Sequence, residues 1–164
     1  MVKLLSKITI SLLTVVLFYS NVSAKDLIGF RGANELFDQQ AFEEFAQRCQ
    51  LNPIVFSSTN VKGALVFINR VIQGEYELYG FSQGAAAVAQ VLEYQQRTQS
   101  QMPQRVITVG AYHTTKVNFA KYGIPFKNYF DHSGRQNPGP GKLLDGVLHM
   151  QMQQRVNEIE SWCY

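Results

Sequence analysis

The feature that most constrains this sequence is the run at residues 80–84, which reads Gly-Phe-Ser-Gln-Gly and fits the pattern G-x-S-x-G. The residues before it, 76–81, favour a β-strand, and the apolar residues after it recur with the i, i+3, i+4, i+7 period of a helix. Such a turn raises the Ser82 hydroxyl above the sheet edge, and the helix start directs backbone N–H groups at a developing anion. This context favours a nucleophilic serine over the alternative, an ordinary serine in a glycine-rich turn.

Strand and helix patterns alternate along the rest of the chain. Strands are expected at residues 27–30, 53–56, 76–81, 105–109 and 125–130. Helices are expected from between 35 and 38 to 50, then at 61–72, 84–99 and 115–122, and from near 149 to 162. This alternation predicts right-handed crossovers and a three-layer α/β/α domain with a five-stranded parallel sheet. In such sheets, ligands bind beyond the carboxyl ends of the strands.

The first 24 residues are typical of a secretory signal peptide. Lys3 and Lys7 precede an apolar stretch at residues 8–19, and Val22-Ser23-Ala24 places small residues at a cleavage site. We expect a signal peptide at 1–24, a single domain at 25–164 and a secreted or periplasmic location. The alternative is an uncleaved N-terminal anchor. Two of the net +3 charges belong to this segment, so no basic stripe points to a nucleic-acid partner.

The chain has two cysteines, Cys49 and Cys163, and both follow the predicted cleavage point. An exported protein meets an oxidising compartment, so we expect a disulfide between them. The alternative is two buried free thiols.

A serine nucleophile needs a base within hydrogen-bond reach. The sequence offers three histidines: His113, His132 and His149. The order nucleophile, acid, histidine is met by Ser82, Asp131 and His149, with Asp131 at the end of the fifth strand. Asp145 is an alternative acid, and His132 is an alternative base. His113 follows the fourth strand and is expected at the rim of the site.

Two backbone N–H groups would hold the oxyanion. One belongs to Gln83, directly after the serine, and the other to the turn after the first strand, around Arg31 to Ala33. The alternative for this turn is a simple connection in which Arg31 is a solvated charge or an ion-pair donor. These four residues, 31–34, contain too few glycines for the phosphate loop of a flavodoxin-like nucleotide binder.

Several short motifs together resemble the α/β-hydrolase superfamily. Residues 30–35, Phe-Arg-Gly-Ala-Asn-Glu, and 80–85, Gly-Phe-Ser-Gln-Gly-Ala, are similar to the arginine-glycine turn and the elbow of cutinases. The first turn is equally similar to class 3 lipases, and so are residues 108–111, 118–120 and 129–131 followed by His149, in order and approximate spacing. The resemblance implies a minimal α/β-hydrolase with Ser82 as nucleophile. These families often carry a serine or threonine where Ala33 stands, and this chain is shorter than typical members.

By this resemblance, the protein is expected to be a serine hydrolase of the esterase or lipase class that cleaves acyl esters. Asp131 would be the acid, His149 the base, and Gln83 with the Ala33 region the oxyanion hole. The substrate would be a small-molecule or lipid acyl ester, with transient contact to a membrane or lipid surface allowed. The alternative is a non-catalytic hydrolase-fold binding or effector protein. No metal-ligand spacing is present, and neither a metal nor another cofactor is expected.

Overall fold

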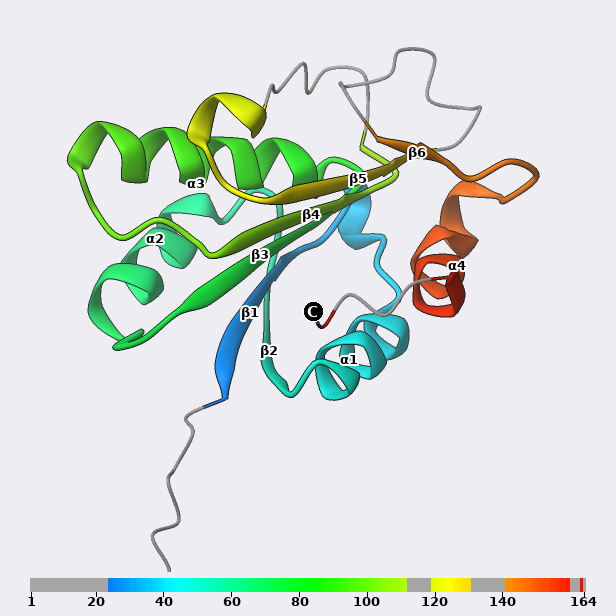
Figure 1. The fold of residues 1–164 in the computed structure, drawn as a ribbon, viewed down its shortest axis with the longest axis horizontal. Helices are drawn as coiled ribbons and strands as arrows, with labels where there is room; N and C mark the ends of the chain where they lie inside the picture. The colour runs from blue at the N-terminus through cyan, green and yellow to red at the C-terminus, as the bar shows by residue number, and fades with distance from the viewer. Residues whose placement is uncertain (1–23, 112–118, 131–140, 160–162, 164) are drawn as a thin grey trace, which may run out of the picture.

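The protein, seen in a computed structural model, is built around one parallel sheet (Figure 1). The structure describes residues 24–111, 119–130, 141–159 and 163. The sheet order is β2-β1-β3-β4-β5-β6, and every neighbouring pair is parallel. The strands are β1 (Lys25–Phe30), β2 (Leu51–Phe56), β3 (Tyr76–Phe81), β4 (Arg105–Val109), β5 (Phe126–Phe130) and β6 (Lys142–Leu143). No helix in these described ranges is long and apolar enough to cross a membrane.

Helices cover both faces of the sheet (Figure 1). The four α-helices are α1 (Gln39–Arg48), α2 (Val61–Arg70), α3 (Gly84–Thr98) and α4 (Met152–Ile159). Three short 3-10 helices are η1 (Ala33–Glu35), η2 (Phe119–Tyr122) and η3 (His149–Gln151). α2 and α3 lie on one face and α1 and α4 on the other, so each face has its own apolar cluster. The expected parallel α/β architecture is confirmed.

The helix starts follow from local capping. The Asp38 carboxylate accepts a hydrogen bond from Ala41 N at 2.9 Å, and the Asn60 side chain accepts one from Gly63 N at 3.1 Å. These side chains satisfy N–H groups that the first helical turn leaves without partners. α1 therefore begins at Gln39, at the late end of the expected range.

The predicted number of strands, five, was wrong. The sixth strand, β6, contains only two residues, which pair with Tyr129 and Phe130 of β5. Both residues of β6 are exposed, so they lack the alternation of apolar and polar residues that marks a half-buried strand. The sheet consequently extends one strand further beyond β5 than the sequence indicated.

β2 is the outer strand on the other side of the sheet and includes Pro53. The carbonyl of Phe56 accepts from Arg31 N at 3.0 Å, so Phe56 directs its backbone groups toward β1. Backbone groups alternate along a parallel strand, and Pro53, three positions earlier, therefore faces away from β1. A residue without an N–H is tolerated at such an outward position.

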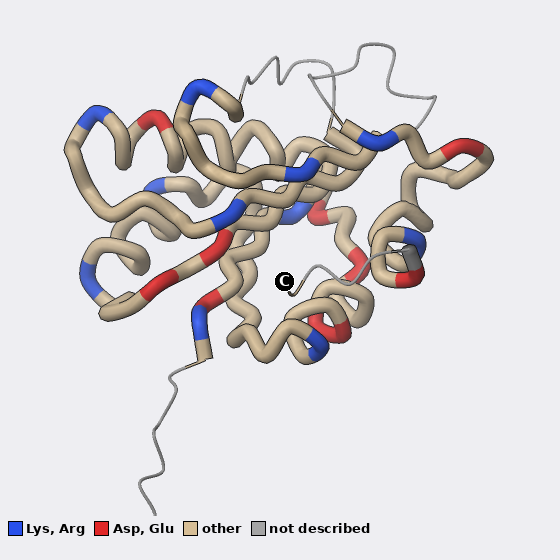
Figure 2. The backbone as a smooth tube through the Cα atoms, viewed as in Figure 1, with Lys and Arg blue, Asp and Glu red and all other residues tan. Residues whose placement is uncertain are grey.

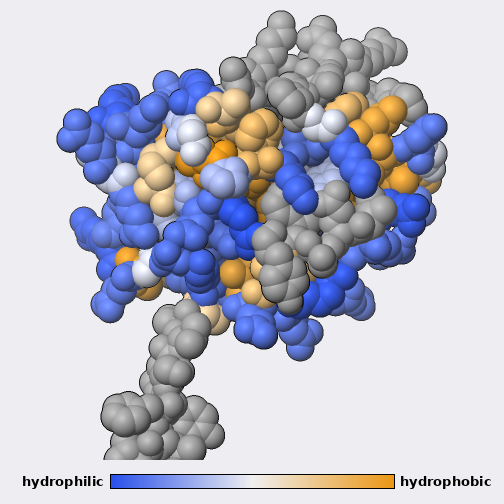
Figure 3. Space-filling view, in the orientation of Figure 1, coloured by the Kyte–Doolittle hydropathy of each residue, from blue (hydrophilic) through white to orange (hydrophobic). Residues whose placement is uncertain are grey.

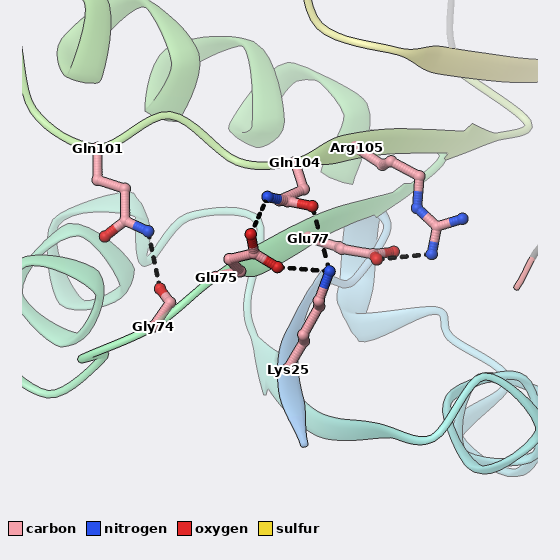
Figure 4. A network of polar contacts seen from close by, with 7 residues as sticks. All are labelled: Lys25, Gly74, Glu75, Glu77, Gln101, Gln104 and Arg105. Atoms are coloured by element: carbon pink, nitrogen blue, oxygen red, sulfur yellow. Dashed lines mark hydrogen bonds and ion pairs between the residues drawn. The ribbon is translucent and has the colours of Figure 1, made fainter. Parts of the chain in front are cut away.

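The amino ends of β1, β3 and β4 are joined by a polar network (Figure 4). Lys25 forms an ion pair with Glu75, whose other oxygen accepts from Gln104. Beside it, Arg105 Nη2 lies 2.6 Å from Oε1 of Glu77, whose side chain is only 2 % exposed. Positively and negatively charged residues are both spread over the rest of the described chain (Figure 2).

The expected disulfide is confirmed. Cys49, at the C-terminal cap of α1, is bonded to Cys163, with the two Cα atoms 4.7 Å apart. The bond joins the end of α1 to the chain beyond α4. It therefore closes a covalent loop that contains every strand except β1 and every α-helix except α1.

Candidate active site

Ser82 stands at the turn between β3 and α3 with a φ of +52°. This left-handed conformation is costly for a residue with a side chain. Neighbouring glycines make the turn possible. A Cβ on Gly84 would lie 2.2 Å from the carbonyl oxygen of Phe30, and a Cβ on Gly80 would lie 2.8 Å from the backbone of Ala85. The G-x-S-x-G pattern therefore reflects two close backbone approaches around one strained serine.

The backbone of Ser82 is held on both sides. Its N–H donates to Val109 O of β4 at 2.8 Å, and its carbonyl accepts from Ala85 N at 3.1 Å. The residue is 5 % exposed. Within the described part of the chain, its hydroxyl makes no hydrogen bond. A fixed backbone with a free hydroxyl suits a side chain that reacts with a ligand.

His149 is brought to the same edge of the sheet. It is the first residue of η3, close to the predicted helix start. Its ring packs on Phe81, the residue before Ser82, with ring centroids 5.1 Å apart. It also lies against Gly110, the residue after β4. The two residues expected to exchange a proton therefore both lie at the carboxyl ends of β3 and β4.

The other titratable candidates are placed only in part. Asp131, His132 and His113 lie outside the described residues. Asp145, the alternative acid, is exposed in the turn between β6 and η3. The choice of Asp131 as the acid therefore stays a prediction.

The turn after β1 contacts the serine. A Cβ on Gly32 would lie 3.1 Å from Cβ of Ser82. The N–H of Arg31 donates to Phe56 O at 3.0 Å, and the N–H of Gly32 donates to Leu36 O at 2.9 Å. Both of these N–H groups are therefore already engaged.

Two further N–H groups near the serine, those of Ala33 and Gln83, form no hydrogen bond with any residue that the structure describes. The Arg31 guanidinium lies 3.3 Å from Glu35 Oε2. The hydroxyl of Ser57 donates to Oε1 of Glu35 at 2.6 Å. Arg31 and Glu35 thus brace the turn, and Ala33 and Gln83 keep donors available.

α4, which follows His149, is anchored to α1 by polar contacts. Gln153 accepts from Asp38 N at 2.8 Å, and Asn157 Nδ2 donates to Ala41 O at 2.6 Å. Arg48 donates to the carbonyl of Asn157 at 2.6 Å. These bonds fix the helix that directly follows η3, in which His149 lies.

Gln153 also connects α4 to the sheet. It forms a side-chain hydrogen bond with Tyr79 of β3. Burial raises the pKa of Tyr79 far above its usual value, and the bond to Gln153 offsets part of that rise. Tyr79 is therefore a neutral hydrogen-bonding group near pH 7.

Large apolar side chains stand exposed around this edge, a feature that the sequence did not reveal. We call them the apolar rim. Its members are Leu36, Leu143, Leu148 and Met150. Leu148 and Met150 directly precede and follow His149 in the chain. The backbone carbonyl of Leu36 accepts a hydrogen bond from the N–H of Gly32, the residue that lies against Ser82. Figure 3 shows apolar side chains gathered at the end of the molecule that carries β6 and the segment before α4.

Among the described residues, no group of three or more His, Cys, Asp or Glu side chains is placed to hold a metal ion.

Comparisons with known proteins identify the fold. No family model matches the sequence, and no curated protein matches it. Solved structures do match. The NocB thioesterase domain from the nocardicin cluster aligns with a TM-score of 0.55 and 8% identity, over 79% of this chain and 86% of that one. YbtT, a type II thioesterase from the yersiniabactin pathway, aligns with a TM-score of 0.54 and 10% identity, over 83% and 90%. RedJ, with a polyethylene glycol bound in its active site, aligns with a TM-score of 0.50 and 11% identity, over 75% and 79%. The protein thus has the fold of α/β-hydrolases, as its motifs indicated.

Proposed function

We propose that this protein is an exported serine hydrolase that cleaves acyl esters or thioesters through Ser82. The observation that carries the proposal is the placement of Ser82, strained and backbone-fixed at the end of β3, with the His149 ring packed on the preceding residue. A serine in this conformation is expensive to maintain, and such strain is typical of functional sites. The likeness to the thioesterases supports the fold, whereas the proposed chemistry is argued from Ser82 and His149 themselves.

In the proposed reaction, His149 removes the proton from the Ser82 hydroxyl as its oxygen attacks the acyl carbon. The imidazolium then gives that proton to the departing alcohol or thiol, which leaves an acyl-enzyme on Ser82. Water, activated by the same imidazole, releases the carboxylic acid and restores the serine. Asp131, which follows β5 in the sequence, is the proposed partner that orients and stabilises the imidazolium.

The oxyanion is proposed to bind the backbone N–H groups of Gln83 and Ala33. Gln83 follows Ser82 in the chain, and Ala33 follows Gly32, which lies against Ser82. Both N–H groups lack partners among the described residues. Gln83 also precedes the 15-residue helix α3, whose N-terminal partial charge favours an anion. Arg31 contributes to this site by bracing the turn rather than by donating its own N–H.

The apolar rim suggests the kind of substrate. Leu148 is 69 % exposed directly beside His149, a position that would contact the acyl chain or a lipid surface rather than water. We propose a small-molecule or lipid acyl substrate on this basis. The disulfide fits export to an oxidising compartment, and the signal peptide at residues 1–24 remains part of this proposal.

The decisive experiment is labelling by a fluorophosphonate together with hydrolysis of p-nitrophenyl esters and acyl thioesters. Ser82→Ala is expected to abolish labelling and to lower kcat/KM by roughly 10⁴-fold or more. Ser100→Ala is the matched control, since Ser100 lies beyond the far end of α3 and should react as the unchanged protein does. Labelling that persists in Ser82→Ala would place the nucleophile elsewhere.

The alternative is a non-catalytic binding or effector protein with this fold. The alanine at position 33, where related sites often add a hydroxyl donor, favours it. The same experiment separates the two. An unchanged protein that takes up no fluorophosphonate, although folded, would support the binding role and end the catalytic one.

A further inference from the structure

Gly110, which follows β4, has no place in the reaction described above, yet its surroundings are unusual. Its φ is +62°, and a Cβ placed on it would lie 2.7 Å from Cε1 and 3.0 Å from Nδ1 of His149. The same Cβ would lie 3.2 Å from Sδ of Met152. The imidazole therefore rests directly on the backbone of this glycine.

A positive φ alone does not explain this glycine. Gly123 and Gly146 also have positive φ values, +67° and +69°, and a Cβ on either would meet nothing within 4 Å. Of these three turns, only that of Gly110 lies against a ring. The missing side chain at Gly110 thus serves the contact with His149 as well as the backbone turn.

The two neighbours of the imidazole, Gly110 and Phe81, are both held in place. The N–H of Gly110 donates to Tyr129 O at 2.7 Å, and the preceding carbonyl accepts from Ser82 N. The ring of Phe81, which also packs against the imidazole, is completely buried. A methyl group on residue 110 would therefore displace mainly His149.

We infer that Gly110 is a positioning residue that sets how closely the His149 imidazole approaches the ends of β3 and β4, and so its distance from Ser82. The effect on catalysis rests on the proposed function, whereas the contact between Gly110 and His149 does not depend on it. Proton transfer needs the base within about 2.6–3.2 Å of the hydroxyl oxygen. A displacement of about 1 Å at such a site costs about 100-fold in rate.

Gly110→Ala tests the inference, and Gly123→Ala is the matched control with the same backbone requirement and open space. Gly110→Ala is expected to lower kcat and the fluorophosphonate rate by about 10- to 100-fold, with KM nearly unchanged. Gly123→Ala should change either rate by less than about twofold, because only its local backbone is affected. Equal rates in the two variants would overturn the inference.

Nuclear magnetic resonance gives a readout that needs no activity. With histidine labelled at Cε1, the His149 resonance, assigned by its loss in His149→Gln, should move in Gly110→Ala and stay in place in Gly123→Ala. If Gly110→Ala does not fold, a measurement on the unchanged protein still tests the inference. It should show a strong Overhauser contact between the Cε1 proton of His149 and the Cα protons of Gly110, and absence of that contact would refute the inference. A protein that shows the contact but takes up no fluorophosphonate would keep the positioning and reject the proposed reaction.

Discussion

The disulfide between Cys49 and Cys163 is expected to supply a large share of the stability of this domain. Its two residues are 114 positions apart, and closing a loop of about 100 residues removes unfolded-state entropy equivalent to about 4.7 kcal/mol. Unfolding entropy is about 2.1 cal/mol/K per residue near 60 °C, so for the roughly 140 residues after position 24 the loss corresponds to a fall in Tm of about 16 °C. Replacing both cysteines with alanine should produce this fall.

The folded state should survive the change, because other contacts hold α4 on α1. Asn157 and Gln153 both bond to the α1 segment without help from the sulfurs. The fluorophosphonate rate of Ser82 at 25 °C should consequently change little, while the free energy of unfolding in urea falls. This separation identifies an effect on the unfolded chain.

Circular dichroism during heating and in urea measures both quantities, with and without dithiothreitol. The reductant should destabilise the unchanged protein to the level of the Cys49→Ala, Cys163→Ala double variant and should leave that variant unaffected. Two free thiols in the denatured, unreduced protein, or equal Tm values for the two proteins, would contradict this reasoning.

Two further substitutions test the packing of the sheet. Gly84→Ala should destabilise the domain by more than about 3 kcal/mol, or prevent folding, because its Cβ would meet the backbone of β1 at 2.2 Å. Gly74→Ala is the control, because a Cβ there meets open space. Its urea midpoint should change no more than is usual for a surface substitution. Arg105→Met should lower the free energy of unfolding by about 3–5 kcal/mol, because it leaves the buried Glu77 carboxylate without its cation. Urea titration checks this value, and a loss below about 1 kcal/mol, as for exposed ion pairs, would show that Glu77 is solvated.

The sequence predicts the elbow well because its signals are local. The change from strand to helical periodicity around Ser82, with glycines on both sides, is contained in fewer than twenty residues. The starts of β3 and β4 agree with the residues expected for the same reason. β6 could not be predicted, because two exposed residues carry no periodicity.

The contacts that complete the site are beyond such reasoning. The packing of His149 on Gly110 joins residues 39 positions apart in the sequence, and only the fold places them together. The turn at Arg31 was located by its motif, but the engagement of its N–H by Phe56 depends on the register of β2. Sequence reasoning therefore identifies which loop supplies the donors and leaves open which of its N–H groups are available.

The left-handed backbone of Ser82 affects more than its reactivity. A residue with a side chain held at positive φ costs on the order of 1–3 kcal/mol of folding free energy, and small domains have little to spare. The resting molecule carries this cost whether or not a ligand is present. The disulfide formed by Cys163, which follows α4 in the chain, offsets this cost. A reducing environment would therefore lower the stability that keeps the strained serine in place.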